Sequence, residues 1–188
     1  MRRYVAPLVT IVLFTCAAVP ALAGPTEDVR TALVRLGGLS SFRMGFTVHA
    51  MSGTMEFAKP DALRIQVSGI EMVRVGSDVF VNALGHGWQR AADSPAAQLV
   101  PELVEMGQRI RRSATDPAGF TAVDLGMQTI AGETLHAYRR TMRADGAHDL
   151  VYVANDGFVH RVAGVGEAAD RVLTFSAFNQ VAPIVAPM

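Results

Sequence analysis

The amino-acid sequence predicts an α+β fold: a half-open antiparallel β-barrel of about ten strands, with an N-terminal helix and a short helical lid insert over a concave apolar cavity. Three observations lead to this prediction. Short segments alternate between apolar and polar residues with a period of two. Glycine-rich turns separate most of these segments. One apolar helical stretch interrupts them near the middle of the chain. Because strand twist curls a sheet of that size, we expect a concave face that the helices cover.

The first half of the chain reads as a helix followed by a meander. Residues 25–36 are expected to be helical, since a proline and acidic residues occupy the first turn and Gly37-Gly38 ends the pattern. Tight turns then join five strands, which is typical of an antiparallel sheet. We expect these strands at residues 42–50, 54–58, 63–68, 71–75 and 78–84.

The second half begins with the insert and returns to strands. The insert is expected over residues 94–110, with Ser94 as N-cap and Pro95 at the first helical position. Pro101 should break it into two pieces, because proline interrupts a helix. After a loop, we expect five more strands, at residues 121–128, 133–142, 148–154, 158–165 and 171–178.

Residues 1–23 have the features of a cleaved signal peptide. Arg2 and Arg3 precede an apolar run at residues 7–18, which is short for a membrane span. Ala21-Leu22-Ala23 is a small-x-small cleavage site. We therefore expect cleavage after Ala23, one domain over residues 24–188, and a periplasmic protein.

The cysteine and the charges limit the possible functions. Cys16 is the only cysteine, and the bulky Phe14 and Thr15 before it disfavour lipid anchoring there. A chain cleaved after Ala23 has no cysteine for a disulfide, a thiol nucleophile or a thiolate metal site. The same cleavage leaves 15 basic and 17 acidic residues, a net charge of −2. This balance argues against a nucleic-acid partner, which usually requires a basic surface.

The residues with catalytic potential form no recognised motif. The five histidines show neither H-x₃-H spacing nor an H-E-x-x-H sequence, and there is no nucleophile elbow or P-loop. We expect no enzyme, no catalytic residue, no metal and no cofactor. One alternative is a hydrolase of lipid-like substrates that depends on His86 or His136. Paired carboxylates, as in a glycosidase, also stay open at this stage.

Several stretches resemble a known superfamily. They are Leu39-Ser40-Ser41-Phe42 with Phe46-Thr47, the run GTMEFAKP at residues 53–60, Ile130-Ala131-Gly132-Glu133, VYVANDGFVHRV at residues 151–162, and Phe178-Asn179-Gln180. In their order and spacing, they resemble the periplasmic lipoprotein carriers (LolA) and the mycobacterial lipid-carrying lipoproteins (LppX and LprG). The resemblance implies a half-open β-barrel around an apolar cavity for the acyl part of a lipoprotein or lipid. It also implies an inner-membrane donor and an outer-membrane acceptor protein.

The candidate ligand-binding residues are the apolar members of the alternating segments. From the first half these are Met44, Phe46, Val48, Met55, Phe57, Ile65, Val67, Val73, Val75 and Phe80, and from the insert Leu99, Leu103, Met106 and Ile110. Alternation alone does not tell which face of the sheet is concave, and a slip of one residue would exchange the two sets.

Lys59 is the candidate lid latch. In the lipoprotein carriers that this chain resembles, the residue before the corresponding proline is an arginine that holds the helical lid shut. A lysine lacks the planar fork of a guanidinium, so the latch should be weaker here.

These features predict a monomeric periplasmic carrier that takes part in outer-membrane biogenesis. It would bind the acyl chains of a lipoprotein or lipid in an apolar cavity and shuttle them between membranes. The alternative on the same fold is a periplasmic sensor or protein-binding module that detects lipid or lipoprotein without transport.

Overall fold

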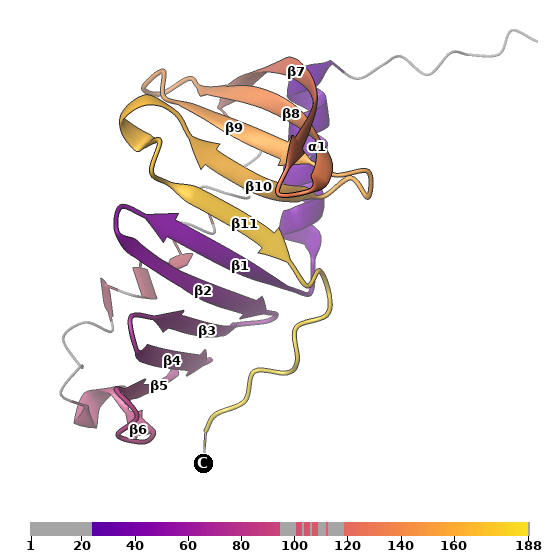
Figure 1. The fold of residues 1–188 in the computed structure, drawn as a ribbon. Helices are drawn as coiled ribbons and strands as arrows, with labels where there is room; N and C mark the ends of the chain where they lie inside the picture. Colours follow the sequence, from indigo (N-terminus) through magenta and orange to yellow (C-terminus); the bar gives the residue numbers. More distant parts are fainter. Residues whose placement is uncertain are drawn as a thin grey trace, which may run out of the picture.

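The structure is a computed structural model that describes residues 24–94, 101–102, 104–105, 107–108, 112 and 119–187. One helix precedes a single antiparallel sheet of eleven strands, which stays open (Figure 1). The predicted fold class, a half-open antiparallel barrel with an N-terminal helix, is therefore confirmed, with eleven strands in place of about ten.

The elements follow the predicted order. The helix α1 spans Pro25–Gly38, and the first strands are β1 (Ser41–Val48), β2 (Met51–Ala58), β3 (Ala62–Val67), β4 (Ile70–Val75), β5 (Asp78–Ala83) and β6 (Gln89–Arg90). The later strands are β7 (Phe120–Ile130), β8 (Glu133–Met142), β9 (His148–Val153), β10 (Val159–Gly164) and β11 (Val172–Ser176). The short β6 and the 3₁₀ turns at Ala91–Asp93 and Gly166–Ala168 were not predicted.

The strand order explains why the sheet is open. The strands run β6-β5-β4-β3-β2-β1-β11-β10-β9-β8-β7, so β6 and β7 are the two edges. The segment between them in the sequence, residues 91–119, therefore joins opposite edges of the same sheet. Within that segment, Gly107 lies against β2 and β3.

The pairing register divides the side chains between two faces. Directly paired residues point to the same face of a sheet, and neighbours along a strand point to opposite faces. Phe46, Leu173 and Val162 are paired in this way across β1, β11 and β10. They belong to one buried cluster together with α1. We call the face that carries this cluster the inner face, and the other the outer face.

The helix α1 covers the second half of the inner face. It begins with Pro25 at its first position and acidic residues in its first turn, as a stable helix start requires. Its buried stripe of Val29, Ala32, Leu33 and Leu36 packs against β7, β8, β9 and β10. Figure 1 shows α1 behind these strands, on the far side of the sheet in that view.

The segment after β11 returns to the start of β1. The Asn179 amide donates to the Ser41 carbonyl at 2.7 Å, and the Ser40 amide and hydroxyl both donate to Asn179 Oδ1 at 2.8 Å. The Val181 amide donates to Ser41 Oγ. These bonds join the end of the chain to the junction between α1 and β1.

Gly53 offers a direct test of the packing between β1 and β2. It lies opposite Phe46, and a Cβ built on it would meet the Phe46 ring at 2.7 Å and the Gln66 carbonyl at 2.4 Å. We expect Gly53→Ala to lower the free energy of unfolding by about 1–3 kcal/mol, because overpacking strains a close-packed core. The measurement is urea unfolding followed by circular dichroism.

Gly38→Ala is the matched control. No atom lies within 4 Å of a Cβ built on Gly38, which ends α1. Alanine is the better helix former, so this variant should keep or slightly raise the stability. Equal stability of the two variants would contradict the close packing of Phe46 on Gly53.

Candidate functional site

An unbroken line of apolar side chains crosses the inner face at right angles to the strands. Each of its members is paired directly with the next across β11, β1, β2, β3, β4 and β5. We call this line the apolar row, and its residues are Phe175, Met44, Met55, Ile65, Met72 and Val81. All six are at most 3 % exposed. Three are methionines, whose flexible and polarizable side chains adapt to apolar partners of varied shape.

The insert lies directly on this row. Gly107 is helical and buried, and a Cβ built on it would lie 3.4 Å from Ile65, 3.5 Å from Leu63 and 3.5 Å from Met55. Val104, one helical turn earlier, packs against the same cluster. The backbone of the insert thus touches the wall of the sheet at a glycine. This contact covers the apolar row at β2 and β3.

Seven of the predicted ligand-binding residues lie together on the inner face. They are Met44, Phe46, Val48, Met55, Phe57, Ile65 and Val67, and all belong to or pack against one cluster. Val73, Val75 and Phe80 instead share the outer face with Arg64 and Asp78, as their pairing shows. Leu99, Leu103, Met106 and Ile110 lie outside the described residues.

The inner-face residues of β4 and β5 were missed by the sequence prediction. They include Met72 and Val81, which extend the apolar row. In β5 the sequence contained the necessary information. The polar Asp78 and Asn82 alternate with Val79 and Val81 and point to the same face as Phe80, which favours Val79 and Val81 as the buried residues. In β4 each of the two alternating sets of residues contains two apolar residues and one charged residue. Alternation therefore could not show which set faces inward.

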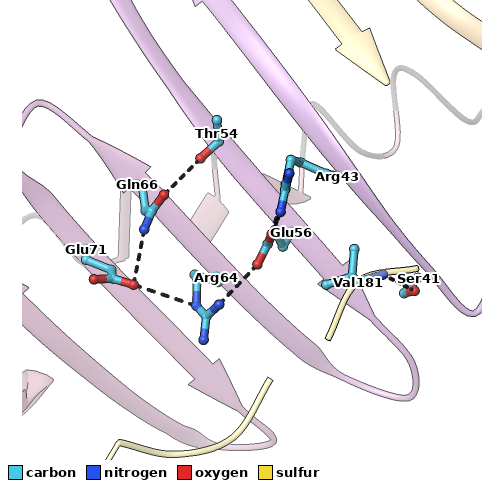
Figure 2. A network of polar contacts seen from close by, with 8 residues as sticks. All are labelled: Ser41, Arg43, Thr54, Glu56, Arg64, Gln66, Glu71 and Val181. Carbon is cyan, nitrogen blue, oxygen red and sulfur yellow. Dashed lines mark hydrogen bonds and ion pairs between the residues drawn. The ribbon is translucent and has the colours of Figure 1, made fainter. Parts of the chain in front are cut away.

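The outer face carries a polar network across β1–β4. Glu56 accepts hydrogen bonds from Arg43 at 2.6 Å and from Arg64 at 3.2 Å (Figure 2). Gln66 links Thr54 to Glu71, with both distances 3.3 Å. A hollow of about 460 Å³ lies at one end of these strands, and its lining combines polar residues such as Thr54, Gln66 and Glu71 with Val67 and Ile70.

The second half of the inner face contains a buried ion pair. Arg140 is 2 % exposed, and its Nε and Nη2 donate to the two oxygens of Asp149 at 2.9 and 2.5 Å. The Arg140 guanidinium also lies 5.6 Å from the Phe120 ring centre. Nearby, burial raises the pKa of Tyr138 to about 12, and Asp28 and Asp124 add to the rise. The phenol is therefore uncharged at neutral pH.

The two histidines of the hydrolase alternative, His86 and His136, do not lie close to a nucleophile in the described contacts. His86 is exposed in the turn after β5. His136 Nε2 lies 2.7 Å from Asp124 Oδ1. A hydrogen bond from the Gly126 amide and a second one with His136 hold the pKa of Asp124 below its usual value. Among the described residues, no group of three or more histidines, cysteines or acids is arranged to hold a metal ion.

Lys59 bonds to the helix α1. Its Nζ donates to the Gly38 carbonyl at 3.0 Å, and its amide donates to the Ser40 carbonyl at 2.8 Å. A cation at this place satisfies one of the carbonyls that the end of a helix leaves unpaired. Its role as a latch for the insert stays a prediction.

Two solved mycobacterial structures share this fold. LprF from Mycobacterium bovis superposes with a TM-score of 0.59 at 9 % identity, over 87 % of this chain and 96 % of LprF. The lipoprotein LppX from Mycobacterium tuberculosis superposes with a TM-score of 0.57 at 15 % identity, over 85 % of this chain and 97 % of LppX.

This chain has the LppX and LprF fold. The finding confirms the fold that the sequence resemblance implied. No family model matches the chain, and no curated protein matches it. Since the identities are low, LppX and LprF support the architecture, and the chemistry has to come from this chain's own residues. None of the helices in the described part of the chain has the length and apolar character that a membrane crossing requires.

The bond from Lys59 to Gly38 predicts a measurable loss of stability. Lys59→Met should lower the free energy of unfolding by about 0.5–1.5 kcal/mol, the usual net value of one hydrogen bond, because a helix carbonyl loses its cation. Lys59→Arg should retain most of the stability. Chemical denaturation measures both. If the methionine variant is as stable as the wild type, Lys59 does not cap α1 in solution.

Proposed function

We propose that this protein binds the acyl chains of a lipoprotein or lipid on its inner face and carries them between membranes. The observation that supports this proposal most strongly is the apolar row beneath the insert. Six paired apolar residues form a surface, and the insert meets it through the backbone of Gly107. We further propose that the leader at residues 1–23 directs the chain to the periplasm, where residues 24–188 act as one domain.

The energetics favour an acyl chain as the ligand of this surface. Burial of each CH₂ group contributes about 0.8 kcal/mol, so a chain laid along the row gains several kcal/mol. Methionines can change rotamer to follow a flexible alkyl chain. The residues proposed as the binding surface are the seven predicted inner-face residues together with Met72 and Val81.

Binding requires the insert to leave the wall, since the row is buried in this structure. The strand pairing does not oppose this movement. Along the chain, the insert is connected to the sheet through β6 on one side and β7 on the other. Its displacement therefore breaks no pairing among β1–β5. The described contacts that it loses, those of Val104 and Gly107, are of the same apolar kind as those that the acyl chain supplies.

The proposal can be tested by fixing the insert to the wall. Residues 24–188 contain no cysteine, so the pair Gly107→Cys and Leu63→Cys is the only reactive pair in a chain produced without the leader. A short thiol-specific crosslinker such as dibromobimane then joins the insert to β3. We expect the crosslinked protein to lose at least about tenfold in the rate at which it moves a fluorescent acyl lipid from donor to acceptor vesicles, because the apolar row stays covered.

The same double variant without crosslinker is the control, and it should transfer the lipid at nearly the wild-type rate. Equal transfer by the crosslinked and open proteins would place the lipid elsewhere on the molecule. Absence of transfer by the wild type, combined with stable binding of the lipid, would contradict transport and favour a sensor.

A further inference from the structure

One charged side chain belongs to the otherwise apolar inner face of β1–β5. Arg74 is paired directly with Leu63 on β3 and with Val79 on β5, so its side chain leaves the sheet on the face of the apolar row. Every other inner-face position of these five strands holds an apolar residue or a glycine. Arg74 lies one step along its strand from this row, two residues after Met72.

The hydrogen-bonding capacity of Arg74 is only partly used. Its side chain is 17 % exposed, and one Nη donates to Asp61 in the turn between β2 and β3. Its Nε is buried and has no hydrogen-bond partner in the described part of the structure. Asp61 is the more exposed partner, with 52 % of its side chain accessible. A guanidinium has five donors in a fixed fork and keeps its charge, so this one retains donors for another anion.

We propose that Arg74 is the anion-binding subsite for the head group of the amphiphile whose acyl chain lies on the apolar row. This inference rests on the proposed function and names the ligand more closely: an acyl amphiphile with a carboxylate or phosphate next to its chain. The apolar row takes the alkyl chain and Arg74 takes the oxyanion, since guanidinium groups bind both anions through paired hydrogen bonds.

Asp61 acts as the competitor for this site. Its carboxylate occupies one edge of the Arg74 fork when no ligand is bound, which spares the guanidinium from lying unpaired among apolar side chains. An incoming oxyanion replaces it, and the exposed Asp61 carboxylate returns to water. The arrangement favours an anionic head group over a neutral one of the same chain length.

The test uses three ligands with one alkyl chain: decanoate, decyl phosphate and decanol, titrated by calorimetry at pH 7 into the protein without its leader. Inorganic phosphate is the fourth ligand and has no chain. We expect the wild type to bind both anionic amphiphiles roughly ten- to hundredfold more tightly than decanol, as charge-assisted hydrogen bonds allow. Inorganic phosphate should bind far more weakly than decyl phosphate.

Two variants break the same ion pair and should have opposite effects. Arg74→Gln should bind all three amphiphiles as weakly as the wild type binds decanol. Asp61→Asn removes the competitor and should tighten binding of both anions with decanol unchanged. Arg64→Gln is the matched control, because Arg64 is the arginine on the neighbouring strand that faces outward to Glu56 (Figure 2). It should bind every ligand as the wild type does.

The outcomes separate this inference from the proposed function. The head-group subsite is overturned if Arg74→Gln still prefers the anionic amphiphiles to decanol. It is also overturned if Arg74→Gln and Asp61→Asn change the affinity for the anions in the same direction. In both cases, decanol binding still supports the acyl site. Inorganic phosphate that binds as tightly as decyl phosphate also overturns it, because the anion then needs no chain. No binding of any amphiphile to the wild type overturns both.

Discussion

The structure depends on the coupling between strand pairing and the two-residue period of side-chain direction. Because Met44, Met55 and Ile65 are directly opposite one another, their side chains point to one face. The same register sends Arg43, Glu56 and Arg64 to the other face, where they form an ion-pair network. A slip of one residue between two strands would bury these charges and expose the methionines. The apolar row and the polar network therefore stabilise the same register.

The open sheet gives the insert its position. A closed barrel would pair β6 with β7, but here both are free edges, and Gly107 of the segment between them lies against the inner face. Its contacts there are Met55, Leu63 and Ile65. The helix α1 covers the other half of the same face, and Lys59 bonds to its last residue. The helix α1 thus covers one half of the inner face, and the insert, which connects β6 to β7 along the chain, contacts the other half at Gly107.

Sequence reasoning predicted the fold and most of the inner face, and it failed where alternation is ambiguous. In β1, β2 and β3 the charged and apolar residues alternate cleanly, so Met44, Met55 and Ile65 could be grouped correctly. In β4 one phase contains Glu71 and the other Arg74, and the inward residue is the charged Arg74. The face on which Arg74 lies is set by the pairing of β4 with β3, and the sequence of β4 alone does not reveal that pairing. The contact of Gly107 with β2 and β3 likewise depends on the strand order, which the sequence pattern of the insert does not reveal.

The most direct test of the account is to locate a bound acyl chain. A fatty acid with a diazirine near its methyl end is photolysed on the protein, and the modified residues are assigned by mass spectrometry of the peptides. We expect adducts on the apolar row, with Met44, Met55 and Met72 modified. Val73 should stay unmodified, because Met72 and Val73 face opposite sides of the sheet. Adducts on Val73 and Phe80, with none on the methionines, would contradict it.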